Sequence, residues 1–342
     1  MRGSAARTVY LDLKPRDPNA ISPEWTVAIF ASRESATVLA QSIQALLRAI
    51  ETYAFVDIIV NGNERLAQEI AEFVGGLRLD LGKSLLLRVW EVAQGDKAHA
   101  WNQYLYGIWA GAELAFFVDG YVRVQRHAFT RIADAMRDDR HALAATGVPS
   151  QGRSAAKLRA QIIAENGIHG NLYSIRGMTL EALRREVFIL PLGIYRTDAL
   201  LGAAIKFNLD PVRYRWDPQR VRVVPDASWS HTPLSAMRPA DWLAQLRRIL
   251  RQGRGVFENL AIRRHLDIER RSLAMLPETA ADLVNNWMES HPGEVWRAIV
   301  KRPLAAFSLR SVKRRIDWSK VGIAPRMLAE LRSGTLQRSI SR

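Results

Sequence analysis

The sequence of 342 residues contains no cysteine. Disulfide bonds and thiolate-bound zinc or iron–sulfur clusters are therefore excluded, and a reducing compartment is the natural expectation. The sequence also lacks any run of about 18 consecutive apolar residues, which a membrane-spanning helix requires. Residues 1–17 lack the apolar segment of a secretory signal. These absences predict a soluble, cytoplasmic protein.

Acidic residues are scarce relative to basic ones. The chain has 34 Asp and Glu against 49 Lys and Arg, a formal net charge of +15. Such an excess predicts a polyanionic partner or surface, which charge alone does not specify: nucleic acid, anionic lipid or a phosphorylated substrate. Because none of the recognised nucleic-acid motifs is present, no nucleic-acid partner is expected.

Short apolar runs alternate with segments of helical periodicity through the first third of the chain. The predicted strands cover 25–30, 55–60, 85–92 and 114–118, and the helices between them cover about 35–50, 64–73 and 98–109. This alternation predicts βαβ units and a mostly parallel sheet of the α/β class. Ligands of such sheets bind beyond the carboxyl ends of the strands, where Ser32, Glu34, Asn61 and Asp119 lie.

The pattern is less regular beyond residue 124. Short strands are predicted at 141–148, 187–192 and 220–224, with a helix over 198–207, and helical periodicity dominates from 241 onward. We expect a leader over 1–23, an α/β domain over 24–235 and a helical, basic C-terminal region over 236–342.

Asp119 ends the fourth predicted strand and is followed by Gly120. A carboxylate there is placed to hold a divalent cation against a diphosphate, because hard cations take oxygen ligands and substrate phosphates complete the shell. The alternative is a simple turn, since Asp-Gly is a favoured hairpin dipeptide.

Four motifs, taken in order, resemble those of the family 2 glycosyltransferases. They are Ala31-Ser-Arg-Glu34, Asn61-Gly-Asn63, the stretch from Gly95 to Asn102, and Val118-Asp-Gly-Tyr121. The resemblance covers about residues 24 to 260. It implies a GT-A nucleotide-sugar-binding fold with a Rossmann-like sheet, and a nucleotide-sugar donor. It also implies donor contacts from Ser32, Glu34, Asn61, Lys97 and Asp119, and Mg²⁺ or Mn²⁺ at a DxD-type motif on Asp119.

Two positions depart from the family pattern. Tyr121 stands where the DxD-type motif has its second carboxylate, and Thr197 precedes Asp198 where the family has an acidic pair. The resemblance assigns to Asp198 the general base that deprotonates an acceptor hydroxyl. The alternative for Asp198 is a helix N-cap. Both departures keep open a catalytically degenerate GT-A protein that binds without turnover.

His231 resembles a histidine that binds the metal from the far side of the domain in some GT-A enzymes. A neutral imidazole is a competent ligand for manganese and a weaker one for magnesium. A hydrogen-bonded structural histidine is the alternative.

Gln245-Leu-Arg-Arg248 resembles the Gln-x-x-Arg-Trp motif of synthase-like members, with Ile249 in place of the Trp. Gln245 and Arg248 share one side of a helix, from which a guanidinium pairs with diphosphate oxygens. A basic, solvated helix face is the alternative.

Apolar and basic residues alternate between Trp296 and Arg310. This mixture suits an interfacial helix at an anionic membrane, which we favour, and it also suits a protein partner or a basic patch used on nucleic acid. The resemblance implies an inverting glycosyltransferase that moves a sugar from a nucleotide-diphosphate donor to a hydroxyl acceptor, lipid-linked or a polysaccharide. We expect it at the inner face of the membrane as a peripheral protein.

Overall fold

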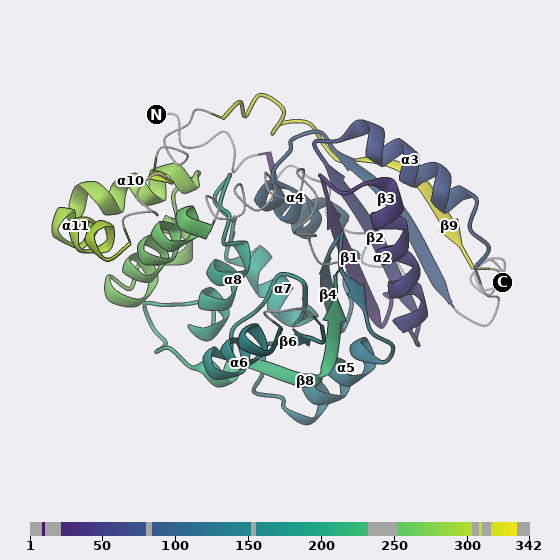
Figure 1. The fold of residues 1–342 in the computed structure, drawn as a ribbon, viewed down its shortest axis with the longest axis horizontal. Helices are drawn as coiled ribbons and strands as arrows, with labels where there is room; N and C mark the ends of the chain where they lie inside the picture. The colour runs from purple at the N-terminus through teal and green to yellow at the C-terminus, as the bar shows by residue number, and fades with distance from the viewer. Residues whose placement is uncertain are drawn as a thin grey trace.

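The structure is a computed structural model that describes residues 9–10, 22–79, 84–151, 155–231, 252–302, 308–309 and 316–333. These residues form a nine-stranded sheet in the order β5-β8-β6-β7-β4-β1-β2-β3-β9. Helices pack on both faces of the sheet (Figure 1). The α/β class predicted from the sequence is confirmed.

The first half alternates strands and helices as predicted, with boundaries that agree to within a residue or two. The strands are β1 (Trp25–Ala31), β2 (Ala54–Asn61), β3 (Leu85–Val92) and β4 (Leu114–Asp119), and they pair in parallel. The helices are α2 (Ala36–Ala49), α3 (Glu64–Gly75) and α4 (Lys97–Gln103), the last continued by a π-helical turn, Tyr104–Ile108. The parallel strands bring their carboxyl ends to one edge.

The second half adds antiparallel pairs to the sheet. Its strands are β5 (Arg123–Val124), β6 (Ala144–Pro149), β7 (Leu172–Arg176) and β8 (Val221–Ser230), and β7 runs antiparallel between β4 and β6. Its helices are α5 (Ala128–Asp138), α6 (Ala155–Glu165), α7 (Gly177–Arg185) and α8 (Thr197–Lys206). The strands predicted at 141–148 and 220–224 and the helix at 198–207 are confirmed as β6, β8 and α8.

The strand predicted at 187–192 is wrong. Only Leu192 forms a bridge, to Thr279. The backbone at Val187 has a φ of 51°, outside the extended region, and Pro191 has no N–H to donate to a ladder. Phe188 and Leu190 are apolar because they fill the core, which their sequence pattern does not distinguish from strand formation.

The C-terminal region is helical over 252–263, α10 (Ala280–Ser290) and α11 (Pro292–Lys301), as predicted. It also contains β9 (Arg326–Arg332), which was not predicted and pairs antiparallel with β3. Arg326, Glu330 and Arg332 interrupt the apolar residues of β9, so its sequence lacks the pattern that predicts a strand. Charged residues of this kind are common on edge strands. Within the described ranges, no helix is both long and apolar enough to cross a bilayer.

The strands of the central sheet are buried on both faces, which explains their continuous apolar runs. In β1, Val27 and Ile29 face a core formed with α2, α3 and α5. Ala28 and Phe30 face a second core formed with α4, α7, α8 and the 252–263 helix. The sheet edge that carries the polar strand ends is therefore held rigidly between two packed layers.

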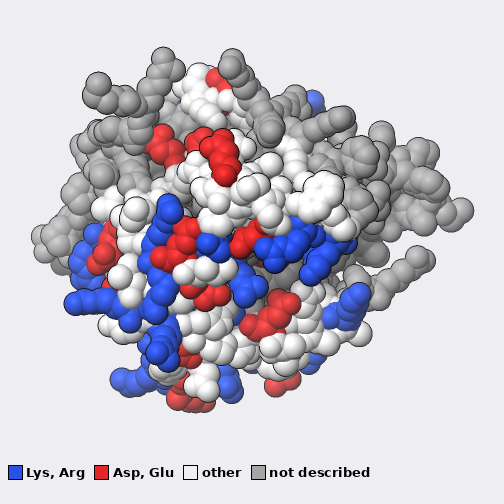
Figure 2. Space-filling view, turned by 90° about the vertical axis from the view of Figure 1, so that its left-hand side faces the viewer, with Lys and Arg blue, Asp and Glu red and all other residues white. Residues whose placement is uncertain are grey.

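The α10 and α11 helices lie at one end of the molecule, and α3 lies toward the other (Figure 1). The face at the α10–α11 end carries a band of Lys and Arg side chains with acidic side chains among them (Figure 2). Basic and acidic side chains are therefore interspersed on the described part of this face (Figure 2).

Candidate active site

Asp119 ends β4 at the carboxyl edge of the sheet, in register with Phe30 of β1. The next residue, Gly120, donates its N–H to the Phe30 carbonyl at 2.8 Å. A Cβ on Gly120 would lie 2.8 Å from the Ala31 Cβ, so no larger residue fits there without a shift. The Asp-Gly pair does form a turn, but not a hairpin, because the chain continues into β5, which pairs with β8.

Lys97 begins α4 and forms an ion pair with the Asp119 carboxylate. Burial lowers the pKa of Lys97, but the charge and hydrogen bond of Asp119, with Asp198 and Glu34 farther out, outweigh it and raise the pKa above its ordinary value. Lys97 is therefore a fixed cation at the edge of the sheet. The side chain of Asp96 caps α4 by accepting from the His99 N–H, which positions Lys97 at the start of the helix.

Asp198 lies in the first turn of α8 rather than at its N-cap, which is Arg196. The N-cap interpretation of Asp198 is wrong, because the helix begins one residue earlier, at Thr197. The Asp198 carboxylate accepts from the Ala199 N–H at 3.0 Å and from the Gly170 N–H at 3.3 Å. Two backbone donors thus orient a half-buried carboxylate.

Gly170 shows how closely the predicted residues meet. The position of a Cβ on Gly170 would be 3.5 Å from Lys97 Nζ, 3.8 Å from Asp119 Oδ2 and 3.8 Å from Asp198 Oδ2. One ammonium and two carboxylates from three separate elements therefore surround a single point beside the Gly170 backbone. This convergence defines the candidate active site.

Residues 169–171 line this site and were not predicted. Asn171 Oδ1 lies 2.9 Å from the Tyr121 hydroxyl, which is also 3.2 Å from Asp119 Oδ2. The Tyr121 residue is 39% exposed, and burial, followed by the charge of Asp119, raises the pKa of its hydroxyl well above its ordinary value. The hydroxyl stays protonated, so a neutral donor stands at the position where the family motif has its second carboxylate.

His169 lies beside the same carboxylates and stacks on Trp229 at a centroid distance of 5.2 Å. Burial lowers the pKa of His169 more than Asp198 and Asp119 raise it, so the imidazole is neutral near pH 7. The run Gly167-Ile-His-Gly-Asn171, placed directly before β7, is the signal that could have identified this segment. Trp229 itself is a core residue, 1% exposed.

His231 follows β8 and lies beside two aromatic residues of the site region. Its ring lies against Tyr121 at 6.1 Å and Trp229 at 5.9 Å between centroids. Among the residues described, no group of three or more His, Cys, Asp and Glu side chains is arranged to hold a metal ion. Gln245 and Arg248 lie outside the described residues.

The loops after β1 and β2 contain the other predicted donor residues. The Glu34 carboxylate accepts from the Ser32 N–H at 2.7 Å and from the Arg33 N–H at 2.9 Å. Asn61 is 4% exposed, and its amide donates to the Ala31 carbonyl at 2.9 Å. Glu34 and Asn61 thus fix the shape of the strand ends, and Asn61 leaves little side-chain surface for a ligand.

The turn after β2 meets the loop before α4. Gly62 has a φ of 63°, and a Cβ on it would lie 2.3 Å from the Gly95 Cα. Only glycine fits this approach. The second and third sequence motifs, 33 residues apart in the chain, are therefore in direct backbone contact beside Lys97.

A buried carboxylate from the C-terminal region supports the approach to Asp198. Glu258 is fully buried and accepts from the N–H groups of Tyr195, at 2.9 Å, and Arg196, at 3.0 Å. Arg254 pairs with Glu258 at 2.7 Å and also donates to the Gly193 carbonyl. The helix over 252–263 therefore holds the segment that leads into α8.

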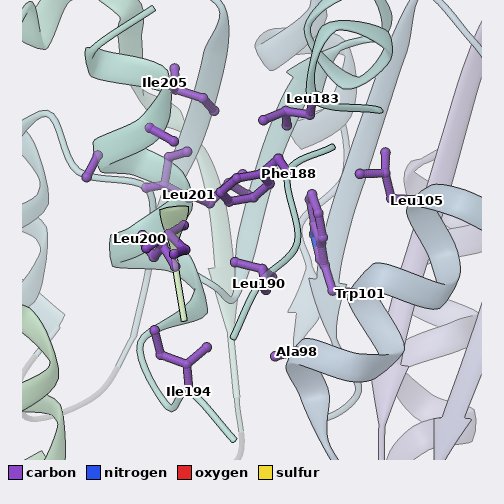
Figure 3. Close-up of a cluster of buried hydrophobic side chains, with 14 of the residues drawn as sticks. Ala98, Trp101, Leu105, Leu183, Phe188, Leu190, Ile194, Leu200, Leu201 and Ile205 are labelled. Carbon is purple, nitrogen blue, oxygen red and sulfur yellow. The ribbon is translucent and has the colours of Figure 1, made fainter. Parts of the chain in front are cut away.

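Apolar side chains join the two helices that carry Lys97 and Asp198. Phe188 and Leu190 lie between Trp101 on α4 and Leu201 on α8 (Figure 3). Removing a buried aromatic side chain such as Phe188 costs about 3–5 kcal/mol. The core thus sets the distance between the cation and the candidate base.

No family model matches this chain, and no curated protein shows significant sequence similarity to it. Solved structures to which the chain is similar include a mannosyltransferase, PcManGT from Pyrobaculum calidifontis, in complex with GDP-Man and Mn²⁺. Its TM-score is 0.49, at 16% identity over 90% of each chain.

Two other solved structures are similar at 14% identity. One is S. aureus TarS 1–349, with a TM-score of 0.42 over 71% of this chain and 73% of that one. The other is glucosyl-3-phosphoglycerate synthase from Mycobacterium tuberculosis with Mn²⁺, UDP-glucose and phosphoglyceric acid, with a TM-score of 0.45 over 74% and 85%. All three similarities are distant, so the function proposed below depends on the geometry of this chain.

Proposed function

We propose that this protein is a GT-A glycosyltransferase that moves a sugar from a nucleotide-diphosphate donor to a hydroxyl acceptor, with inversion at the anomeric carbon. The observation that carries the proposal is the convergence of Lys97, Asp119 and Asp198 around one point at the carboxyl edge of the sheet. The order of the sequence motifs supports the same function.

Lys97 is proposed to bind the donor diphosphate. Its side chain is 34% exposed, so its ammonium could turn from Asp119 to a phosphate oxygen of a bound donor. Positive charge placed there stabilises the nucleoside diphosphate as it leaves, and such electrostatic stabilisation commonly contributes more to catalysis than any other single effect. Ser32 and Glu34 would border the nucleotide on the β1 side, and Gln245 and Arg248 remain predicted donor contacts.

Asp198 is proposed to be the general base. Its carboxylate accepts the proton of the acceptor hydroxyl while the hydroxyl oxygen forms its bond to the anomeric carbon. The bond from that carbon to the diphosphate oxygen breaks in the same displacement, and the nucleoside diphosphate leaves with the electron pair. The N–H groups of Gly170 and Ala199 hold the carboxylate in place.

A divalent ion fits this edge only with a small set of protein ligands. Asp119 offers one carboxylate, Tyr121 offers a protonated hydroxyl in contact with it, and Lys97 occupies the other carboxylate oxygen. Mg²⁺ readily binds through one or two carboxylates with substrate phosphates and water. We propose that Asp119 would hold Mg²⁺ or Mn²⁺ together with the donor, where the ion would supply further charge stabilisation on the diphosphate.

The acceptor is proposed to be a hydroxyl compound, either lipid-linked or a polysaccharide, and the protein to act in the cytoplasm. The basic surface at the α10–α11 end supports a position next to an anionic structure (Figure 2).

The proposal is tested with a panel of nucleotide sugars, with Mg²⁺, with Mn²⁺ and with a chelator, by measuring release of the nucleoside diphosphate. We expect turnover of one or a few donors, raised by the divalent ion. Binding of a donor with no turnover under any of these conditions would indicate a degenerate binding protein, the interpretation favoured by Tyr121 and Thr197. If no nucleotide sugar of the panel were bound or turned over, both the glycosyltransferase and the degenerate binding protein would be contradicted.

A further inference from the structure

We propose that one face of this protein docks onto the surface of a bilayer that contains anionic lipid. The face consists of the loop 211–217, the turn 268–271 and the exposed side of α11, and is called here the basic-aromatic face. It does not include the candidate active site, and the proposal does not depend on glycosyl transfer.

The loop 211–217 presents five consecutive exposed side chains. They are Val212, Arg213, Tyr214, Arg215 and Trp216. Single exposed apolar side chains are ordinary, but several gathered on one surface mark an interaction site. The loop lies immediately after α8 and is tied to its end by the Asp217 N–H, which donates to the Lys206 carbonyl at 2.9 Å.

Hydrogen bonds from the Arg270 side chain hold the loop in this exposed form. The Arg270 guanidinium donates to the carbonyls of Pro211 at 2.7 Å, Val212 at 3.1 Å and Tyr214 at 2.9 Å. The Lys206 ammonium lies 4.7 Å from the centroid of the Trp216 ring and fixes one face of it. A loop ordered in advance loses little conformational entropy when it binds a surface.

The exposed side of α11 has the same character. Trp296 and Val300 are 68% and 60% exposed and lie one helical turn apart. Arg297 and Lys301 lie beside them and are also exposed. The Ile299 side chain, predicted to be part of the interfacial helix, instead packs against the core, so the exposed apolar residues of α11 are these two.

The loop and α11 belong to one surface because charged contacts link them. Glu269, next to Arg270, pairs with Arg264 at 3.0 Å and with His291 at 3.4 Å. His291 is the N-cap of α11, and Arg264 also pairs with Glu294 in its first turn. Ile268 is exposed on the same turn, and the basic band of Figure 2 lies on this end of the molecule.

The balance of charges on the face explains why it suits an anionic surface. The acidic residues of the face pair with neighbouring basic residues. Asp217 pairs with His141 and Arg220. Asp267 pairs with Arg263, Glu269 with Arg264 and Arg271, and Glu294 with Arg264. In contrast, Arg213, Arg215, Lys301 and Arg302 are exposed, and none of them is in an ion pair with another residue of the described ranges. The face therefore keeps unneutralised positive charge, the complement of an anionic headgroup layer.

The apolar residues select lipid over nucleic acid. Val212, Ile268 and Val300 lie among the basic residues, and aliphatic side chains gain nothing from a phosphate backbone. Trp and Tyr favour the boundary between headgroups and acyl chains, where the apolar ring and its polar atom are both accommodated. Asp198 lies in the first turn of α8, whereas the loop 211–217 follows the other end of that helix, about 12 Å away along its axis.

The test is co-sedimentation of the full chain with vesicles of phosphatidylcholine alone or with about 30% phosphatidylglycerol, at about 0.1 M and 0.5 M salt. We expect binding to the anionic vesicles only, weakened by salt. Arg213→Ser with Arg215→Ser should weaken partitioning by at least about tenfold, since each basic residue contributes about fivefold. Trp296→Ser with Val300→Ser should weaken it at both salt levels, because apolar insertion is not screened.

Matched controls lie away from the face. Arg65→Ser with Arg78→Ser removes two exposed charges on and just after α3, toward the other end of the molecule. Met178→Ser removes an apolar side chain of α7 that is 69% exposed. Both controls should bind as the wild type does. Equal loss in the α3 control would contradict the proposal, as would duplex DNA binding that the Arg variant abolishes and the Trp296–Val300 variant leaves unchanged.

Discussion

Asp119 contacts two partners of different character, the Lys97 ammonium and the Tyr121 hydroxyl. The cation balances the Asp119 carboxylate, and a carboxylate at position 121 would compete for the same ammonium. The site therefore carries one strong cation and two separated carboxylates. This arrangement explains how a motif with a single acid can still form a charged site at the strand end.

Gly170→Ala tests whether the point between these charges is substrate space. The new methyl would make ordinary contacts of 3.5–3.8 Å with Lys97, Asp119 and Asp198, so the melting temperature should change by no more than about 2 °C. Donor turnover should fall by tenfold or more, because the methyl occupies the space that the reacting groups need. Steady-state kinetics and thermal unfolding measure both.

Gly202→Ala is the matched control. It lies in α8, and its new methyl would contact Ile168 at 3.6–3.8 Å with no charged group near. Turnover should be retained, with a slight gain in stability from helix propensity. Equal turnover in both variants would mean that the space beside Gly170 is not used by substrate.

At the scale of elements, the site is held by helix starts and by one helix from outside the predicted domain. α4 places Lys97, α8 places Asp198, and the helix over 252–263 binds the chain just before α8 through Glu258. The 252–263 helix of the C-terminal region therefore packs as part of the unit that forms the candidate site. Its contribution is mechanical, because Glu258 is buried and touches backbone rather than the site.

Glu258→Gln tests this support. The change removes the negative charge that pairs with the buried Arg254 guanidinium. The free energy of unfolding should therefore fall by about 3 kcal/mol or more. The segment before α8 should also loosen, so kcat should fall while the donor Kd stays within about twofold of wild type. Asp267→Asn, which alters an exposed pair with Arg263 at 3.5 Å, should cost no more than about 1 kcal/mol and leave kcat intact.

A loss of stability in Glu258→Gln with an unchanged kcat, measured well below the unfolding temperature, would show that the helix stabilises the fold without positioning Asp198. The two readouts therefore separate a structural role from a positioning one.

His99 on α4 makes stability depend on pH. Burial lowers its pKa to about 4, and its Nδ1 lies 2.7 Å from the Tyr10 hydroxyl. The unfolded chain takes up this proton near pH 6.5, so the contribution of His99 is fully present above that pH and is lost as pH falls toward 4. The loss between pH 7 and pH 5 is about 2 kcal/mol.

His99→Gln should remove this dependence. Urea unfolding at pH 7 and pH 5 should show a smaller drop for the variant than for the wild type. The comparison between the two proteins is needed because Asp96, whose pKa burial raises to about 6, changes stability in the opposite direction over this range. Equal drops in both proteins would show that His99 is not buried as a neutral group.

At the scale of the whole molecule, three distant parts of the chain meet at one edge of the sheet. The first half of this arrangement could be predicted, because local periodicity identifies each strand and helix and the carboxyl ends of parallel strands meet. Asp119 follows from that rule, whereas Lys97, at the start of α4, was expected only from the family resemblance. Asp198 required the family resemblance, since nothing local shows that α8 points its first turn at β4.

The remaining features depend on contacts that no local pattern encodes. In the sequence, Glu258 forms an ordinary i, i+4 pair with Arg254, and only the fold shows that it is buried. Residues 169–171 reach the candidate site only because β7, which follows them, pairs with β4. β9 looks like a charged, solvated segment and is a strand only because β3 offers a free edge. The predicted strand at 187–192 is the opposite case. Its apolar side chains are buried by packing in the core, although the segment does not pair with a strand of the sheet.

The most direct test of the proposed chemistry compares wild type and Asp198→Asn on two quantities, donor Kd by titration calorimetry and kcat for the best donor of the panel. If Asp198 is the general base, kcat falls by about 10²–10⁴ while the donor Kd is unchanged, because the base contacts the acceptor and not the donor. A variant that turns over as fast as the wild type would contradict the assignment of Asp198 and the mechanism built on it.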